Sequence, residues 1–324
     1  MSLSSLAPGK VNLSLFLGAT REDGRHELVT LFQPVSLADE VVLSVVAGAG
    51  ADEVVCPGVS GVNLAERALA ELRARGWDAP WVRIDIAKRI PVAAGMAGGS
   101  ADAAATLRLA AAGALGAAGA LGTAGVLGAA GALGAAGAPG VLDEVARVLG
   151  ADVPSQLAPG PVLGTGAGEV LTRVPPRAPH AFLILPSREG LSTPAVFAEA
   201  DRLGLPRSAG DLLLRRRALE EALSAGPELP AALLVNDLES AARSLCPSID
   251  DALGLARSLG ADGALVCGSG PTVAGVFWGA DGLARAAAAV ASARADFPQA
   301  AAVVPVDADF ARVRGTDRHP CPAQ

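Results

Sequence analysis

The chain has 324 residues, of which 51% are apolar and 18% charged, and its formal net charge is -7. A chain of this composition can bury a large core, so disorder over its whole length is excluded. The length predicts two domains or one large one. The acidic balance argues against nucleic-acid binding, which depends on clustered Lys and Arg, so an anionic ligand would have to be attracted locally.

The start of the chain and its cysteines indicate where the protein works. No basic region precedes the first apolar stretch, and Lys10 lies inside it, which is not typical of a signal peptide. Cys56, Cys246, Cys267 and Cys321 are dispersed, with no CxxC pair and no histidine among them. This spacing argues against structural zinc and against a disulfide scaffold. A cytoplasmic location is therefore expected.

The first third of the chain predicts strands and helices in alternation. In chain order we expect a strand at 10–17, a turn at 21–24, a strand at 41–46, a helix at 63–75, a strand at 82–86, a glycine-rich loop at 93–100 and a helix at 101–109. The helix at 63–75 is indicated by Leu64, Ala68 and Leu72, which recur on one face.

An uncharged segment, residues 109–142, is long enough to suggest a membrane span. Glycine recurs there at every third position from Gly113 to Gly140, so the glycines wind around all faces of a helix and would each weaken it. Collagen has the same period but needs more proline than Pro139 supplies. We interpret residues 113–140 as a low-complexity Gly/Ala insertion, mobile or loosely extended, with a membrane span as the remote alternative.

The second half of the chain predicts an α+β order. A short helix at 142–149 is closed by Gly150, and a proline-dense stretch at 172–179 is the best domain boundary. We therefore expect one domain at 1–172, a second at 173–311 and a frayed tail at 312–324. Strand and helix segments alternate in the second domain at 182–185, 215–223, 248–259, 264–266, 273–277, 283–293 and 302–306.

The loop at 93–100 is the first candidate site. Its glycines let backbone N–H groups turn inward, and the following helix offers its positive N-terminal end to an anion. Ser100 can cap that helix or present its hydroxyl to a metal bound to phosphate. The pattern is neither a P-loop nor a dinucleotide fingerprint. By itself, such a turn is more often structural than functional.

Lysine is scarce in this sequence. Of 26 basic residues, only Lys10 and Lys88 are lysine, and asparagine occurs only at Asn12, Asn63 and Asn236. A compact ammonium differs from the planar fork of arginine at a crowded phosphate, so the two lysines are candidates for a role that Arg cannot fill. Nucleotide composition and chance are the alternative explanation.

Four motifs taken together resemble the GHMP kinase superfamily. They are Pro8 to Leu13 (PGKVNL), Asp23 to Leu28 (DGRHEL), Pro91 to Ala105, and Gly268 to Thr272 (GSGPT), and they occur in the order and approximate spacing of that superfamily. The resemblance implies an α+β fold, with an N-terminal α/β ATP-binding domain and a C-terminal ferredoxin-like domain. It also implies an ATP-dependent kinase that acts on a small molecule in the cleft between them.

Within the superfamily, residues 23–28, 149–154 and 164–169 are most similar to the branch that phosphorylates the 2-hydroxyl of 4-diphosphocytidyl-2-C-methyl-D-erythritol in the non-mevalonate isoprenoid pathway. Homoserine and mevalonate kinases lack these segments. Two alternatives remain open: another small-molecule kinase of the superfamily, of the homoserine or mevalonate type, and a catalytically impaired nucleotide-binding homologue.

The resemblance assigns roles to individual residues. Lys10 and Asp152 match the catalytic pair. ATP would be bound by Asn63, Pro91, Ala93, Ala94, Gly95, Met96, Ala97, Gly98, Gly99 and Ser100, with Mg²⁺ at Ser100. The cytidine-diphosphate substrate would be bound by Asn12, Arg25, His26, Thr193, Phe197, Gly268, Ser269 and Gly270. A small-molecule substrate, no nucleic acid, no membrane and a monomer or weak homodimer are the partners expected.

Three positions depart from the pattern of the superfamily. Arg25 stands where a tyrosine usually stacks on the cytosine, and the chain contains no Tyr. A guanidinium can also stack on a base. Ala94 replaces a common loop glycine, which costs about 1 kcal/mol or more if the position needs a positive φ. Ser155 stands where an aromatic residue is usual beside Asp152.

Overall fold

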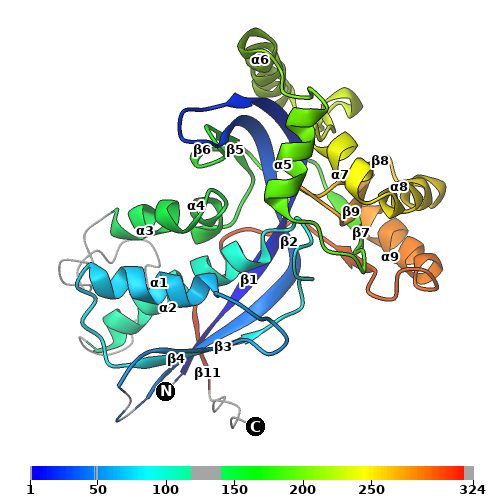
Figure 1. Cartoon of the computed structure of the whole chain (residues 1–324). Helices are drawn as coiled ribbons and strands as arrows, with labels where there is room; N and C mark the ends of the chain where they lie inside the picture. Colours follow the sequence, from blue (N-terminus) through cyan, green and yellow to red (C-terminus); the bar gives the residue numbers. More distant parts are fainter. Residues whose placement is uncertain (1, 47, 49, 118–139, 317–324) are drawn as a thin grey trace.

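The computed structural model of the chain describes residues 2–46, 48, 50–117 and 140–316. Most of the insertion expected at 113–140 lies outside the described residues, as does Cys321. The described part has a seven-stranded sheet and a four-stranded sheet, each covered by helices (Figure 1). None of the helices in that part has the length and apolar character needed to cross a membrane.

Two long strands dominate the first sheet. β1 (Ser2–Thr20) and β2 (His26–Val45) pair antiparallel along most of their length. The sequence predicts only parts of them, because β1 is buried almost without interruption and so lacks the alternation of a half-exposed strand. The other strands are β3 (Glu53–Val55), β4 (Val82–Ala87), β5 (Val162–Thr165), β6 (Val170–Arg173) and β11 (Arg314–Thr316), in the order β11-β1-β2-β4-β3, with β5 between β2 and β6.

Four helices pack on one face of the first sheet. They are α1 (Leu64–Ala74), α2 (Gly98–Ala117), α3 (Val141–Leu149) and α4 (Val153–Leu157), and α1 and α2 lie side by side (Figure 1). Asn63 caps α1 by accepting a hydrogen bond from the Ala65 amide at 2.9 Å. The helix α2 packs closely because its buried face consists largely of alanine.

The second sheet consists of four antiparallel strands. β7 (His180–Leu185), β8 (Gly263–Val266), β9 (Val273–Trp278) and β10 (Ala301–Val303) lie in the order β10-β7-β9-β8. Helices follow β7 and β9 in the chain, so the connectivity is ferredoxin-like, as expected. The helices of this part are α5 (Thr193–Arg202), α6 (Ala209–Ala225), α7 (Glu239–Leu245), α8 (Ser248–Ser258) and α9 (Gly282–Ala293), with a short 3₁₀ turn at Ala231–Leu233.

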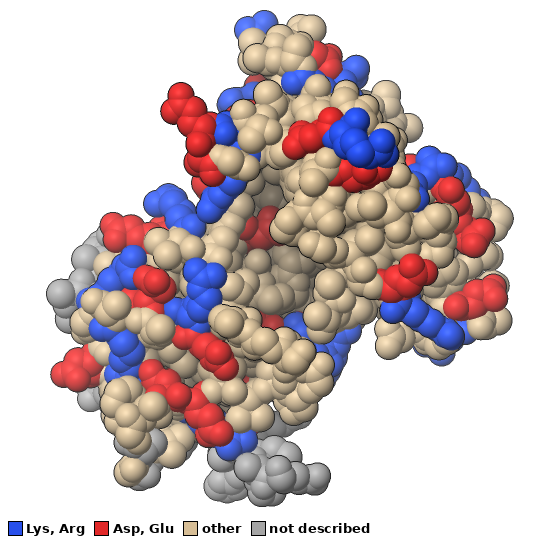
Figure 2. Space-filling view, in the orientation of Figure 1, with Lys and Arg blue, Asp and Glu red and all other residues tan. Residues whose placement is uncertain are grey.

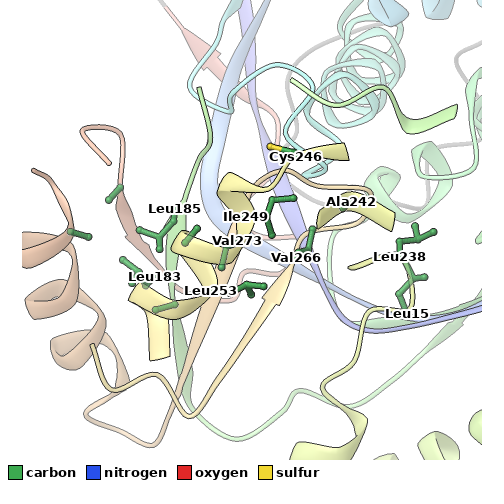
Figure 3. Packing of buried hydrophobic residues seen from close by; sticks show 14 of the residues in the cluster. Leu15, Leu183, Leu185, Leu238, Ala242, Cys246, Ile249, Leu253, Val266 and Val273 are labelled. Atoms are coloured by element: carbon green, nitrogen blue, oxygen red, sulfur yellow. The ribbon is translucent and has the colours of Figure 1, made fainter. Parts of the chain in front are cut away.

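Two cores join the parts of the molecule. One lies under α7, α8 and α9 and includes Leu15 from β1 beside Leu238 (Figure 3). The other contains Phe16 of β1, Phe182 of β7 and Leu219 of α6. Strand β1 therefore contributes to both halves of the fold, and the segment of β1 and β2 between them positions the candidate site.

The structure corrects several predictions at the level of elements. The tail was expected to fray from Arg312, but 314–316 form β11, which pairs with β1 at 2–4. The helix predicted at 101–109 begins earlier, at Gly98, and continues to Ala117. Helices α5 and α7 were not predicted, because α7 is short and each lies between stretches rich in loop residues. The expected boundary at 172–179 begins in the last two residues of β6, ends just before β7 and stays a prediction.

Candidate active site

A cavity of about 480 Å³ opens between the two parts of the molecule (Figure 2). Residues from β1, the 93–100 loop, α5 and the turn after β8 line it. The sequence-predicted site residues that line it are Lys10, Asn12, Asn63, Pro91, Ala93, Ala94, Gly95, Ala97, Gly98, Gly99, Ser100, Asp152, Thr193, Phe197, Gly268 and Ser269. The fold thus brings most of the candidate residues to one cavity from six separate stretches of sequence.

The position of Lys10 follows from an irregularity in the pairing of β1 with β2. The register shifts between Pro8 and Lys10 and again between Asn12 and Ser14. The Lys10 amide therefore donates to the carbonyl of Met96, in the glycine-rich loop, at 3.0 Å. Bulges of this kind change the direction of side chains and are common beside active sites.

Two acceptors hold the Lys10 ammonium. Nζ donates to Asn12 Oδ1 and to the Gly95 carbonyl, each at 2.8 Å, and the Lys10 side chain is 5% exposed. Asn12 Nδ2 in turn donates to Thr30 Oγ1 at 2.8 Å, which fixes the direction of its amide. This network holds a buried cation at the floor of the cavity.

The Asp152 carboxylate faces Lys10 across 4.0 Å. Asp152 precedes α4 but makes no capping bond, and its side chain is 34% exposed. Within the described parts of the chain its carboxylate has no other polar partner in hydrogen-bond range. The Ser155 hydroxyl, where the superfamily pattern has an aromatic, donates to the Asp152 backbone carbonyl at 2.7 Å and leaves the carboxylate free. A partly exposed carboxylate beside a buried cation is suited to accept a proton.

The loop at 93–100 presents the N-terminus of α2 to the cavity. Its backbone has positive φ at Ala93 and Ala97, at 54° and 56°, and at Gly95, at 74°. The departure at Ala94 is not a strained position, because the positive φ values fall on its neighbours. The first turn of α2 contains Ser100, so its unpaired backbone N–H groups and this hydroxyl are available to an anion.

The glycine-rich loop touches the turn after β8 through its backbone. A Cβ on Gly95 would lie 1.9 Å from the Cys267 carbonyl oxygen, and one on Gly268 would lie 2.9 Å from Lys10 Nζ. Both positions have positive φ. Glycine at these two positions lets two loops from different halves of the molecule close around the lysine.

A buried charge network, which the sequence did not predict, lies beside the loop. Lys88 Nζ contacts both Asp39 and Asp102, the latter at 2.8 Å, while Asp102 Oδ1 is buried with no partner among the described residues. Burial, opposed by the charge of Lys88, raises the pKa of Asp102 to about 7. The pKa of the Cys56 thiol nearby is also raised, by burial and by Asp102. The scarcity of lysine was the one sequence signal for Lys88.

The opposite wall holds the residues expected to bind a base. Thr193 Oγ1 and Ser269 Oγ form a hydrogen bond of 2.8 Å between α5 and the turn after β8. The His26 ring packs against Phe197 at 5.1 Å between centroids, and its Nε2 lies 2.8 Å from Asp201 Oδ1. Asp201 was not predicted, because it lies far from His26 in sequence.

Four predicted residues do not line the cavity. His26 is buried against Phe197. Met96 is buried within the 93–100 loop, and Gly270 is buried within the turn after β8. Arg25 is exposed in the turn between β1 and β2. Its amide donates to Asp23 Oδ1 at 3.0 Å, which holds the turn. Arg25 therefore does not lie where it could stack on a base bound in the cavity of this structure.

Comparison with known proteins decides the family. Residues 63–151 match the N-terminal domain of GHMP kinases, and 213–296 match their C-terminal domain. A 4-diphosphocytidyl-2-C-methyl-D-erythritol kinase from Nocardia farcinica is 42% identical over 298 residues, which cover 89% of each chain. This chain belongs to the 4-diphosphocytidyl-2-C-methyl-D-erythritol kinase family.

Other relatives agree with this membership. The kinase of this family from Streptomyces coelicolor is 41% identical over 286 residues, covering 85% of this chain and 87% of the relative. A crystal structure of 4-(cytidine 5'-diphospho)-2C-methyl-D-erythritol kinase superposes with a TM-score of 0.70 at 32% identity, covering 94% of this chain and 99% of that one. A homoserine kinase from Cytophaga hutchinsonii, at 18% identity and a TM-score of 0.55, shares the fold. The predicted resemblance and fold are confirmed, and the protein is a phosphotransferase.

Proposed function

We propose that this kinase transfers the γ-phosphoryl group of ATP to the 2-hydroxyl of 4-diphosphocytidyl-2-C-methyl-D-erythritol, a step in the synthesis of isoprenoid precursors. The observation that carries the proposal is the Lys10–Asp152 pair, 4.0 Å apart. The pair lies in a cavity that the glycine-rich loop lines on one side and Thr193 and Phe197 on the other. Such a cavity can hold the phosphates of ATP on one side and an acceptor with a nucleobase on the other.

Asp152 is the base of the proposed reaction. Its carboxylate accepts the proton of the acceptor hydroxyl as the hydroxyl oxygen forms a bond to the γ-phosphorus. The bond from that phosphorus to the bridging oxygen of ADP breaks, and ADP leaves with the electron pair. Lys10 pairs with the carboxylate and offsets the negative charge that develops on the transferred group. Phosphoryl transfer needs little more than this positioning and charge compensation.

The donor site is assigned to the start of α2. Backbone N–H groups of 97–100 and the helix dipole favour the phosphates of ATP. Asn63 and the adjoining Cys56 line the part of the cavity beyond the loop, where the adenosine would lie. An acidic protein can therefore bind a polyanion, because the positive field is confined to one helix end and Lys10.

The residues present fit Mg²⁺ that arrives with the nucleotide. Across the described stretches, no group of three His, Cys, Asp or Glu side chains could hold a metal ion by itself. Mg²⁺ is usually held by one or two protein oxygens together with the phosphates, and the Ser100 hydroxyl and Asp152 carboxylate line the same cavity. Bound there, Mg²⁺ would supply neutralisation of phosphate charge.

The acceptor site is assigned to the opposite wall. Phe197 offers a ring face on which a cytosine can stack, and the buried His26 ring packs against Phe197 and supports it. The cavity between this wall and Lys10 is lined by Asn12, Thr193, Gly268 and Ser269. In this assignment the sugar alcohol lies beside Asp152 while the base contacts Phe197.

The test is a coupled assay of ADP release with purified protein, Mg²⁺-ATP and 4-diphosphocytidyl-2-C-methyl-D-erythritol. We expect turnover with this acceptor and none above background with homoserine, mevalonate or phosphomevalonate. Turnover with one of those acceptors instead would replace the proposed substrate. No release of ADP with any acceptor would favour a nucleotide-binding homologue without catalysis. The cytoplasmic location and the monomeric or weakly dimeric state stay predictions, for cell fractionation and sedimentation to check.

A further inference from the structure

We propose that Arg108 is a positioning residue, which holds Asp152 opposite Lys10 by tying together the three elements that form the site. The proposal rests on the catalytic roles proposed above for Lys10 and Asp152. Arg108 lies on α2, well past the loop, and does not line the cavity. It would therefore act on the reaction through the backbone and not by touching a substrate.

The guanidinium reaches two other elements from α2. Nη1 donates to the Gln156 carbonyl of α4 at 2.6 Å, and Nη2 donates to the Leu6 carbonyl of β1 at 2.8 Å. Nη2 also donates to Ser5 Oγ at 3.0 Å, and Ser5 Oγ donates onward to the Ala311 carbonyl at 2.8 Å. One side chain thus connects the helix that begins at the phosphate loop, the helix that follows Asp152 and the strand that carries Lys10.

The Arg108 guanidinium is buried without an acidic partner among the described residues. Over the part of the chain that the structure describes, its partners are neutral oxygens, and no carboxylate lies within salt-bridge distance. Burial lowers the pKa of Arg108 to about 10, so the group stays charged at neutral pH. Arginine has a planar fork of N–H donors, which can bond acceptors on α4 and β1 at the same time. The single ammonium of lysine cannot do so with the same geometry.

Asp152 depends on such a tie because little else holds its carboxylate. The side chain makes no capping bond to α4, and its distance to Lys10 is 4.0 Å. The helix α4 has five residues, and the buried Gln156 side chain leaves both of its polar atoms without a partner in the described structure. Apart from Arg108, a polar contact to α4 comes from the exposed Arg173, which donates to Ala158 just after the helix.

Arg177 offers a matched control. Its guanidinium, like that of Arg108, donates to neutral oxygens, which here are the backbone carbonyls of Pro175, Leu223 and Gly226, and burial lowers its pKa as well. These contacts join the β6–β7 connection to the end of α6, and Arg177 does not line the cavity. Replacement of either arginine removes comparable bonds, but only one of the two touches α4.

The experiment compares Arg108→Lys with Arg177→Lys in the full-length protein. We expect Arg108→Lys to lower kcat about tenfold or more while the KM values for ATP and the acceptor stay within about threefold, because small displacements of a catalytic group are costly. Arg177→Lys should lower the melting temperature and leave kcat unchanged. In an Asp152→Asn background, Arg108→Lys should cause no further loss of kcat, since the two changes act through the same carboxylate.

Hydrogen exchange supplies a readout that does not need turnover. Arg108→Lys should speed amide exchange in the segment 152–158 relative to wild type, and Arg177→Lys should not. The proposal is overturned if Arg108→Lys leaves kcat and this exchange unchanged, or if its loss of kcat adds in full to that of Asp152→Asn. If the wild-type protein does not turn over the cytidine acceptor, the proposed function fails, and hydrogen exchange still decides whether Arg108 positions α4.

Discussion

Lys10 illustrates how one residue can be buried, charged and still available to a substrate. Its ammonium donates to Asn12 and to the Gly95 carbonyl, so two of its three protons are satisfied by neutral oxygens. The Asp152 carboxylate lies 4.0 Å from the ammonium, close enough for ion pairing but beyond hydrogen-bond distance. An arginine fork would not fit here, because a Cβ on Gly268 would already lie 2.9 Å from Nζ.

Replacement of either member of this pair should remove catalysis and preserve nucleotide binding. For Lys10→Met and Asp152→Asn we expect kcat to fall by on the order of 10²–10⁴, as for loss of a general base or its charge partner. The dissociation constant for ATP should change much less than kcat, because the backbone N–H groups at the start of α2 remain, although Lys10→Met removes the bond to the Gly95 carbonyl. Steady-state kinetics and calorimetric ATP titration measure the two quantities, and equal weakening of both would contradict the assigned roles.

Asp201 should control how the acceptor is bound. Its carboxylate lies 2.8 Å from His26 Nε2, which also lies 3.2 Å from Thr20 Oγ1, so the carboxylate helps to fix the ring that packs against Phe197. Asp201→Ala should raise KM for the cytidine acceptor about tenfold, as expected for loss of a hydrogen bond to a charged group, and leave KM for ATP unchanged. The comparison is Arg25→Ala, which should have little effect because Arg25 is exposed. A larger effect from Arg25→Ala would restore the stacking role expected from the sequence.

Asp102 should make stability depend on pH near neutrality. Its pKa rises from 3.8 to about 7 on folding, so the folded state binds the proton more tightly than the unfolded state. This contribution is fully present below about pH 4 and is lost as the pH rises through 7. The melting temperature of Asp102→Asn minus that of wild type should therefore increase from pH 4 to pH 8.

Asp211, whose pKa is shifted in the opposite direction, serves as the control for the pH measurement. Arg207 lowers the pKa of Asp211 below the usual value for an aspartate, so that carboxyl is ionised throughout the range from pH 5 to pH 8. The difference between Asp211→Asn and wild type should therefore stay constant between pH 5 and pH 8. A constant difference for Asp102→Asn over the same range would show that Lys88 compensates the burial of Asp102.

At the scale of elements, the site depends on how the loop at 93–100 meets its neighbours. The loop is held by β1 through the Met96 carbonyl and by the lysine through Gly95, while α2 continues directly from it. The turn after β8 approaches the same loop closely enough that a single methyl group would collide with it. The cavity is thus lined both by an N-terminal helix and by a C-terminal turn.

Two glycines of the loop should respond to alanine in opposite ways. Gly95→Ala places Cβ 1.9 Å from the backbone oxygen of Cys267 at a φ of 74°, and it should destabilise the fold by about 2 kcal/mol or more. Gly99→Ala lies in the first turn of α2, where the nearest atom is Leu64 Cδ1 at 3.8 Å. It should raise stability by about 0.5–1 kcal/mol. Thermal unfolding measures both, and equal melting temperatures would contradict the packing argument.

At the scale of the whole molecule, the two halves share hydrophobic cores. Phe16 of β1 is fully buried with Phe182 and Leu219, which belong to the second half of the chain. Backbone hydrogen bonds also join the two halves. The Leu15 amide donates to the Val235 carbonyl at 2.7 Å, and the Ser36 amide donates to the Val304 carbonyl at 2.9 Å. The cavity walls therefore belong to one body, and neither half retains its full core alone.

The halves should consequently unfold together. Phe16→Ala should cost about 3–5 kcal/mol and still give one transition, because the lost contacts belong to both halves. Leu214→Ala, on the exposed surface of α6 at 63% exposure, should change stability by less than about 0.5 kcal/mol. Calorimetry and denaturant unfolding followed by two probes test this. Two separate transitions in the wild-type protein would mean that the halves fold independently.

Much of the candidate site was predictable from sequence because its chemistry is carried by short local motifs. A glycine-rich turn before an alanine-rich helix predicts an anion site wherever the helix lies, and the scarce Lys10 and Asn12 stand side by side on one strand. The order of four such motifs was enough to indicate the family and its fold. The extent of β1 and β2 was not predictable, since a strand buried on both faces has no alternation to detect.

The amino-acid sequence by itself determined which reactive groups the chain carries, namely the lysine, the phosphate loop and the aspartate at the start of α4. Only the tertiary structure decided which residues support them. Asp201 reaches His26, and Arg108 reaches Gln156, across long separations in sequence. The exposure of Arg25 was decided in the same way. Such pairings depend on how sheets and helices pack, and no local preference of a residue encodes a partner that lies on another element.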